Sequence, residues 1–252
     1  MSALNIIPRP SPNFDARTRP IDLVVLHYTG MQDAEAALSR LTDPAPVAGR
    51  FPGPWRLPDV APDAPLARVS SHYVVDEAGK IFGVVAEDNR AWHAGASSWE
   101  GEGDVNSRAI GVEIVNGGHD FGLPDFPDAQ IEAVIALVGD ILGRWSLKPA
   151  RVVAHSDIAP DRKLDPGEKF PWKRLAAAGV SIWPHPVAVH DEDPVTALQE
   201  RLARFGYGVS ASGTIDAATK AALIAFQRRF RPSRIDGAPD KETLELLAGA
   251  TP

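Results

Sequence analysis

The first two thirds of the chain combine short apolar runs with helical patterns. Apolar, β-branched runs at residues 21–27, 109–116 and 151–154 have the length of buried strands. Two further β-prone runs, 70–76 and 80–85, are separated by three residues that end in a glycine, which predicts a hairpin. The pattern therefore predicts strands at five places.

The clearest helix is predicted at residues 127–146, where apolar residues recur at helical spacing and form one face that must pack on a sheet. Shorter helices are predicted at 33–41, with Asp33 as N-cap, and at 170–178. The apolar face of the long helix consists of Ile131, Val134, Ile135, Val138, Ile141, Leu142 and Trp145.

The last quarter of the chain is helical throughout. Amphipathic segments at 196–207, 216–227 and 240–247, separated by glycine-containing turns, predict a three-helix module. We therefore divide the chain into a domain of residues 1–185 and a small domain of residues 186–252. The predicted core of the module is small enough to be marginal on its own, and it consists of Leu198, Leu202, Leu223, Phe226 and Leu244.

Two stretches fit no regular element. Residues 1–20 are rich in Pro and Arg and are expected to form an extended lead-in. Residues 42–68 contain seven prolines together with Phe51 and Trp55, which favours an ordered surface loop with a functional role over a floppy insertion.

Composition excludes several classes of function. The chain has 252 residues and a formal net charge of −7, which argues against nucleic-acid binding because that affinity comes mainly from clustered Lys and Arg. Without cysteine there are no disulfides or thiolate ligands, so any metal must be bound by His, Asp, Glu or water. The sequence contains no apolar stretch of 18 residues, so no membrane span is predicted. No export signal is recognisable, so we expect a cytoplasmic protein, with the periplasm as the alternative if a signal has been removed.

The segment 155–167 is the candidate active-site segment. It follows the predicted strand 151–154 and contains His155, Lys163 and Asp165 among turn-forming residues, and loops at strand ends commonly hold functional groups. His27 ends another predicted strand. Two histidines and one aspartate would make a three-ligand Zn²⁺ site with an open fourth position, which is typical of a hydrolase.

Two further residues have candidate catalytic roles. Lys163 could stabilise the oxyanion that forms when an amide is attacked, and Glu113, inside an apolar run, could be the base that takes a proton from water. The alternatives are a solvated surface charge for Lys163 and, for Glu113, a salt bridge to Arg108 or Arg151. Their location at the ends or in the interior of buried strands favours function, because an unpaired polar group there is costly.

The remaining histidines are weaker candidates. His72 and His93 could line the cleft, although structural or surface roles are favoured for both, and His119, His185 and His190 are expected at the surface. Asp157 and Asp161 are expected to cap the turn or to orient His155 through its second ring nitrogen.

These motifs, taken in order, resemble the zinc N-acetylmuramoyl-L-alanine amidases of the AmpD and AmiD type, which are related in fold to phage lysozyme-amidases and peptidoglycan recognition proteins. The resemblance covers about residues 20–180 and implies an α/β fold with a mixed β-sheet flanked by helices. It also implies cleavage of the amide between N-acetylmuramic acid and L-alanine, zinc ligands at His27, His155 and Asp165, and catalytic Glu113 and Lys163. The motifs that carry it are Val24-Val25-Leu26-His27-Tyr28-Thr29, Ser71-His72-Tyr73-Val74-Val75, Ala91-Trp92-His93-Ala94-Gly95, Asn106 to Asn116 and His155 to Gly167.

The tail resembles the three-helix peptidoglycan-binding module. Arg231-Pro232-Ser233-Arg234 departs from that pattern in being more basic, which leaves open whether this module binds glycan or packs on the catalytic domain. The similar residues are Leu198-Gln199, Phe205-Gly206-Tyr207, Gly213-Thr214-Ile215-Asp216, Thr219, Ala225-Phe226-Gln227 and Asp236-Gly237.

The leading hypothesis is therefore a zinc amidase acting on peptidoglycan or on muropeptides, including their 1,6-anhydro form. One alternative is a non-catalytic peptidoglycan recognition protein on the same scaffold, for which the loss of a metal ligand would be expected. Another is a zinc hydrolase with a different amide substrate.

Overall fold

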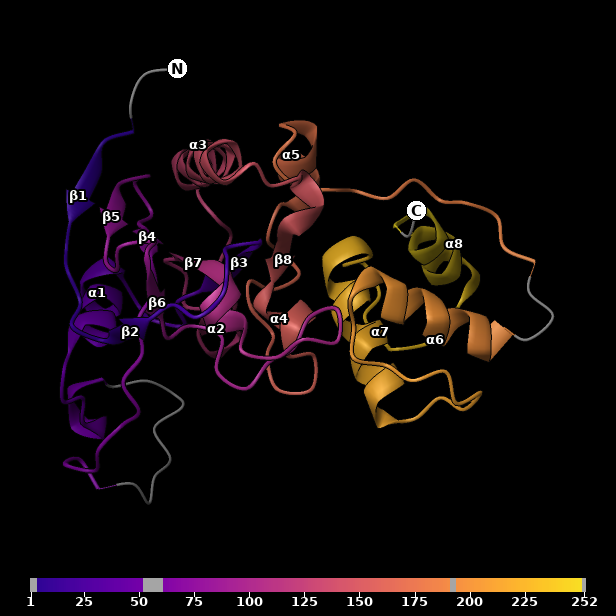
Figure 1. Ribbon diagram of the computed structural model, residues 1–252, viewed down its shortest axis with the longest axis horizontal. Coiled ribbons are helices and arrows are strands. Elements are labelled where there is room, and N and C mark those ends of the chain that lie inside the picture. Colours follow the sequence, from indigo (N-terminus) through magenta and orange to yellow (C-terminus); the bar gives the residue numbers. More distant parts are fainter. Residues whose placement is uncertain (1–3, 52–60, 191–193, 251–252) are drawn as a thin grey trace.

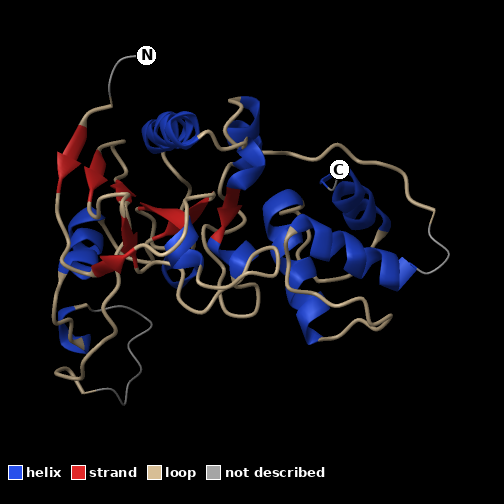
Figure 2. Ribbon diagram, in the orientation of Figure 1, coloured by secondary structure: helices blue, strands red, loops and turns tan. Residues whose placement is uncertain are grey.

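The computed structural model describes residues 4–51, 61–190 and 194–250. Its centre is a six-stranded mixed sheet in the order β1-β5-β4-β7-β3-β8 (Figures 1 and 2). A second, two-stranded sheet pairs β2 with β6 in antiparallel fashion. The strands are β1 Ile6–Pro8, β2 Phe14–Ala16, β3 Leu23–Tyr28, β4 Tyr73–Val75, β5 Ile81–Gly83, β6 Asn89–Ala91, β7 Ala109–Ile114 and β8 Val152–Ala154.

The helices lie on both faces of the large sheet and in the tail. They are α1 Ala34–Thr42, α2 Val105–Arg108, α3 Asp128–Trp145, α4 His155–Ile158, α5 Trp172–Ala177, α6 Pro194–Phe205, α7 Ala217–Phe230 and α8 Lys241–Ala250, with short 3₁₀ turns at Ala48–Arg50, His119–Phe121 and Pro149–Arg151. None of the helices in the described part of the chain combines the length and apolar content needed to cross a bilayer.

Four neighbouring strands, β4, β7, β3 and β8, run parallel, so their carboxyl ends meet at one edge of the sheet. Successive side chains of a strand point to opposite faces. In β3, Val24 and Leu26 belong to the core that contains α3, while Leu23 and Val25 belong to a second core on the other face. The sequence of each strand thus supplies two cores at once.

The first face of the sheet is covered by α3 and α5. The apolar side of α3 packs on Ile110, Val112 and Ile114 of β7, together with Trp172 and Leu175 of α5. This arrangement confirms the expected amphipathic helix and its packing on a sheet. It leaves the opposite face for the functional groups.

The opposite face of the sheet is covered by α1 near β4 and by the tail near β8. Near β4, α1 packs through Ala37, Leu38 and Leu41 on Val74, and Asp33 caps α1 by accepting a hydrogen bond from the Ala36 amide at 2.9 Å. Near β8, one continuous apolar cluster joins sheet residues such as Val25 to tail residues. The tail therefore packs directly on the sheet (Figure 1). Its contribution includes Leu198, Leu202, Tyr207, Leu223, Phe226 and Phe230.

Most predicted elements are confirmed, including the 70–85 hairpin, which pairs β4 with β5, and the three helices of the tail. The lead-in is extended, as expected, and its strands β1 and β2 join the two sheets, which was not predicted. One expectation was wrong, because the segment after β8 begins with the four-residue helix α4 instead of a loop. Of the proline-rich segment 42–68, residues 52–60, with Trp55, lie outside the described residues.

Candidate active site

The strand register places three predicted site residues side by side. His27 of β3 is directly opposite Glu113 of β7, and Leu26 is opposite Ala154 of β8, so His155 follows at the end of the next strand. All three positions belong to the face that is not covered by α3, because they continue the alternation of Val25, Ala109 and Val153. Distant parts of the chain thus meet through strand pairing.

Asp165 reaches this point because the chain folds back after α4. The Ser156 amide donates to the Asp165 carbonyl at 2.9 Å, and the Lys163 amide donates to the Ala159 carbonyl at 3.0 Å. His27 Nδ1 lies 2.8 Å from His155 Nδ1 and 3.0 Å from Asp165 Oδ2, and His155 Nδ1 lies 2.9 Å from the same oxygen. The three predicted ligand side chains therefore converge on one buried point.

Hydrogen bonds on the far side of each imidazole determine which nitrogen faces that point. His155 Nε2 lies 3.1 Å from the Ala94 carbonyl, which can only accept, so Nε2 carries the proton and Nδ1 presents a lone pair. His27 Nε2 lies 3.0 Å from His93 Nδ1. If His27 Nδ1 likewise presents its lone pair, His27 Nε2 donates to His93, and His93 carries its own proton on Nε2.

A single side chain holds both of these supporting groups. Asn106 Oδ1 accepts hydrogen bonds from the His93 amide at 3.0 Å and from the Ala94 amide at 2.7 Å. The residue that contacts His27 and the carbonyl that contacts His155 are therefore fixed by one buried carboxamide of α2.

The donor set is suitable for zinc. Four-coordinate zinc, with bond lengths of about 2.0–2.2 Å, places its ligand atoms roughly 3.3 Å apart, close to the separations found here. Burial, followed by the proximity of His155, lowers the pKa of His27 to about 4, so its imidazole is neutral at pH 7. Burial alone would raise the pKa of Asp165, but His155 and His27 lower it well below its usual range. A neutral imidazole and an ionised carboxylate are the forms that bind a cation.

Glu113 stands beside this cluster and forms no ion pair within the described part of the chain. Its Oε2 is buried and has no hydrogen-bond partner among the described residues. Arg108 pairs with Asp22, and Arg151 pairs with Asp22 and Glu100, so the salt bridge considered for Glu113 is not formed. Burial, reinforced by the charge of Asp165, raises the pKa of Glu113 well above its ordinary value.

A cavity of about 390 Å³ opens above these groups. Lys163 lines it together with Glu113, so both candidate catalytic groups reach the same space as the cluster of ligands. The other side chains in its wall include Tyr28, Arg40, Trp92, His93, His119 and Arg162.

The remaining sequence expectations had mixed outcomes. His93 lines the cavity, whereas His72 is buried behind it and accepts from the Gly111 amide at 2.9 Å.

His119 was wrongly placed at the surface, because it lines the cavity and contacts the Tyr28 hydroxyl at 3.0 Å. His185 and His190 are exposed, as expected. Of the two roles expected for Asp157, capping the turn is confirmed, because its Oδ2 accepts from the Ala154 amide at 2.9 Å, whereas the second nitrogen of His155 faces the Ala94 carbonyl.

Arg17 is a residue that sequence reasoning missed. Its guanidinium lies 2.9 Å from His72 Nε2 and donates to the Ser107 carbonyl at 2.7 Å. Arg17 thereby joins the N-terminal segment to the strands behind the cavity. Its position in a segment rich in Pro and Arg gave no signal of this contact.

Comparison with known proteins agrees with this geometry. Residues 17–168 match the family model of N-acetylmuramoyl-L-alanine amidases. The chain belongs to this amidase family. Residues 191–247 match the model of a peptidoglycan-binding domain, which agrees with the expected module in the tail.

Relatives of this amidase include AmiD of Escherichia coli, which is 36% identical over 244 residues, covering 88% of this chain and 79% of AmiD. AmpD of Haemophilus influenzae, named a 1,6-anhydro-N-acetylmuramyl-L-alanine amidase, is 33% identical over 67% of this chain and 89% of its own length. The solved complex of E. coli AmiD with anhydro-N-acetylmuramic acid-L-Ala-D-gamma-Glu-L-Lys superposes with a TM-score of 0.73 at 33% identity, covering 99% of this chain and 91% of that chain. The expected mixed sheet flanked by helices is thus confirmed as the amidase fold.

Proposed function

We propose that this amidase is a zinc hydrolase that cleaves the amide between N-acetylmuramic acid, or its 1,6-anhydro form, and L-alanine. One observation carries the proposal: the donor atoms of His27, His155 and Asp165 lie within 3.0 Å of one another, beside a carboxyl group that has no ion-pair partner among the described residues. Structural roles for these residues would not require such a costly arrangement.

In this proposal His27, His155 and Asp165 hold the zinc ion. When bound, zinc polarises the scissile carbonyl and makes a nearby water more acidic. In its ionised form, which a bound cation favours, Glu113 accepts a proton from the attacking water at its unpaired oxygen and then delivers it to the leaving nitrogen. Lys163, on the wall of the same cavity, stabilises the negative charge that develops on the carbonyl oxygen.

The substrate class is supported by the relatives. AmiD of E. coli and AmpDh3 of Pseudomonas aeruginosa have been solved with an anhydromuramyl tripeptide and an anhydromuramic pentapeptide, at 33% identity and a TM-score of 0.73 each. We infer that this chain also acts on a muramyl peptide, either as a soluble fragment or within polymeric peptidoglycan.

The proposal is tested by metal analysis and by incubation with a defined muropeptide. We expect about one zinc per chain and release of the stem peptide with L-alanine at its amino end. His155→Ala should lose metal and activity together, because it removes a central ligand. A chain that contains zinc and binds muropeptides without cleaving them would be a recognition protein, and cleavage of other amides alone would indicate a different zinc hydrolase.

Two further expectations belong to this proposal. The division into residues 1–185 and 186–252 is supported by the separate family matches at 17–168 and 191–247. A cytoplasmic location would fit action on recycled fragments, and a periplasmic one would fit action on the polymeric wall. Fractionation of cells that express the full-length native protein distinguishes the two.

A further inference from the structure

Asp157 links the metal site to the tail of the chain. It lies in α4, two residues after His155, and its side chain is fully buried. Asp157 Oδ2 accepts a hydrogen bond from the Ala154 amide at 2.9 Å and so caps α4. A helix of four residues is not stable by itself, so the orientation of His155 depends on contacts such as this one.

Two donors from the tail complete the environment of Asp157. The Tyr207 hydroxyl donates to Asp157 Oδ1 at 2.8 Å, and Arg229 Nη1 donates to Asp157 Oδ2 at 2.6 Å. Burial and the Asp157 carboxylate raise the pKa of Tyr207 well above its ordinary range, so its hydroxyl remains a donor. A buried carboxylate is costly unless it is paired and hydrogen-bonded, and here the tail supplies both.

Arg229 also contacts the strand that leads to His155. Its Nη2 donates to the Val152 carbonyl at 2.9 Å, and its guanidinium lies 4.1 Å from the centre of the Trp172 ring. Arg229 therefore spans β8, α4 and α5 from its position on α7. Its side chain is 1% exposed.

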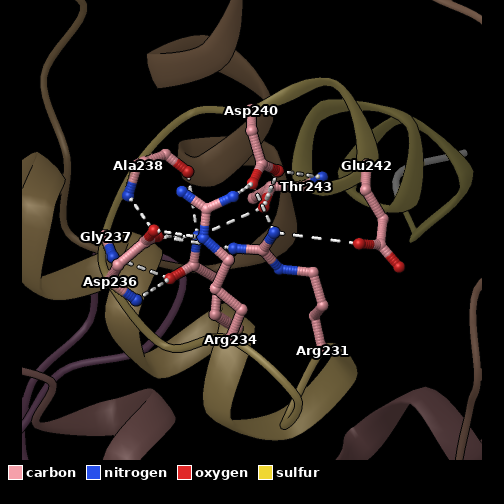
Figure 3. Close-up of polar contacts among 9 residues, drawn as sticks. Arg231, Arg234, Asp236, Gly237, Ala238, Asp240, Glu242 and Thr243 are labelled. Carbon is pink, nitrogen blue, oxygen red and sulfur yellow. Dashed lines mark hydrogen bonds and ion pairs between the residues drawn. The ribbon is translucent and has the colours of Figure 1, made fainter.

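The neighbouring arginines of the tail behave differently. Arg231 forms ion pairs with Asp240, Asp236 and Glu242, and Arg234 pairs with Asp236 and Asp240, all within the tail (Figure 3). The basic residues that depart from the peptidoglycan-binding pattern are thus engaged in stabilising the start of α8. Arg229 is instead directed at the catalytic domain.

A second connection runs along the other side of the cavity. Arg228 Nε lies 3.6 Å from Glu168 Oε2, and the same oxygen lies 3.0 Å from His119 Nε2. His119 in turn contacts the Tyr28 hydroxyl at 3.0 Å, next to His27. Adjacent arginines of α7 therefore pair with Glu168, which contacts the cavity residue His119, and with Asp157, which lies in α4 beside His155.

We propose that the tail is a structural part of the metal site, in which Tyr207 and Arg229 are positioning residues that hold Asp157 and, through α4, the ligand His155. This inference rests on the proposed zinc site. It assigns to a module of the peptidoglycan-binding family a role in metal binding that does not depend on any glycan contact.

The experiment measures zinc affinity by chelator competition, and hydrolysis of a soluble muropeptide, for the full chain and for Arg229→Met, Arg229→Lys and Tyr207→Phe. We expect Arg229→Met to weaken zinc binding about tenfold or more, the range seen when groups that support metal ligands are lost. kcat should fall while KM changes little, because neither residue lines the cavity. Tyr207→Phe keeps the ring and should show a smaller loss, and Arg229→Lys should recover part of the loss.

Arg234→Met is the matched control, since it removes an arginine of the tail that does not touch Asp157. Circular dichroism establishes that each variant is folded, and if Arg229→Met is not, Tyr207→Phe carries the test. Asp157→Asn provides a double-mutant cycle: Arg229→Met should have little further effect in that background.

The inference is overturned if Tyr207→Phe and folded Arg229→Met bind zinc and turn over muropeptide as the unmodified chain does. An equal loss in Arg234→Met would also overturn it, because the effect would then be general to the tail. Failure of the proposed function itself is distinct, since the unmodified chain would then contain no zinc or would not cleave the amide.

Discussion

At the scale of single residues, the environment of Glu113 lowers the stability of the folded protein in favour of catalysis. Glu113 is half-buried, and its Oε2 is buried without a hydrogen-bond partner among the described residues, beside the like charge of Asp165. The sequence indicated this tension, because a carboxylate inside the apolar run 109–116 needs a partner or a purpose. It did not exclude Arg108 or Arg151 as partners, since their pairing with Asp22 depends on a fold that brings residue 22 to them.

The raised pKa of Glu113 predicts a pH-dependent gain of stability in Glu113→Gln. Below the ordinary carboxyl pKa both folded and unfolded chains are protonated at this position, and the substitution should be nearly neutral. Above it the unfolded chain ionises while the folded protein does not, so the folded protein loses stability as pH rises towards the raised pKa. In zinc-free protein, the melting temperature of Glu113→Gln relative to the unmodified chain should therefore increase as the pH rises above the ordinary carboxyl pKa of about 4.

The same variant should have no measurable amidase activity. Glu77→Gln, at an exposed turn position, is the control and should show no such trend with pH. A constant difference in melting temperature across this range would mean that Glu113 titrates normally in the folded protein.

Lys163 is predicted to act on the transition state and not on the metal. Lys163→Ala should retain zinc while kcat falls on the order of 10²-fold or more, as for loss of an oxyanion donor. Lys169→Ala, which removes a lysine paired with Asp125 at 2.9 Å, should have ordinary kinetics. Unchanged turnover in Lys163→Ala would remove this residue from the mechanism.

At the scale of elements, the strands could be predicted from their apolar runs, but their register could not. His27 and His155 were recognised because each ends a run, and the parallel pairing of β7, β3 and β8 explains why they meet. Sequence patterns carry no information about which residue of one strand faces which residue of another. His119 was misplaced for a related reason, because only the folded chain brings it to Tyr28.

Close packing of His93 on the active-site face of β7 predicts that Gly111→Ala disturbs the site. A Cβ at residue 111 would lie 2.5 Å from the ring of His93, which contacts His27 Nε2. We expect weaker zinc binding and lower activity, because the ring must move away from its ligand partner. Chelator competition measures the first effect.

Gly143→Ala is the matched control for that substitution. Its Cβ would meet nothing within 4 Å on α3, so the variant should keep full activity and gain up to about 1 kcal/mol of stability. Equal zinc affinity in Gly111→Ala and Gly143→Ala would show that His93 tolerates displacement.

At the scale of the whole molecule, the tail and the sheet share one apolar cluster. The three helices were predictable from their periodicity, whereas their docking was not, because Arg228 and Arg229 look like ordinary surface residues of a helix. The AmpD structure at 30% identity and a TM-score of 0.57 matches over 99% of its own length but only 70% of this chain. A chain of about the size of the catalytic domain thus exists in this family.

This comparison predicts that a chain ending at residue 185 folds but is less stable. The short chain lacks Arg229, so Asp157 loses its ion-pair partner. Breaking a buried ion pair costs about 3–5 kcal/mol, which corresponds to a fall in melting temperature of roughly 6–20 °C. Asp157→Asn should restore part of that loss in the short chain while destabilising the full one. Thermal unfolding of the four proteins measures both effects, and identical melting temperatures for the full and short chains would contradict the prediction.

The ion pair between Arg229 and Asp157 also limits how this chain can be recombined. A chimera in which residues 186–252 were exchanged for a related module without an arginine at the position of Arg229 would keep Asp157 but lose its ion-pair partner, even if the junction were placed between residues 185 and 186. Such a chimera would need a compensating substitution at residue 157, which lies in the catalytic domain and not in the exchanged module. The two halves of the gene are therefore expected to evolve together, and hybrids between distant relatives should work best when both partners of the pair come from one parent.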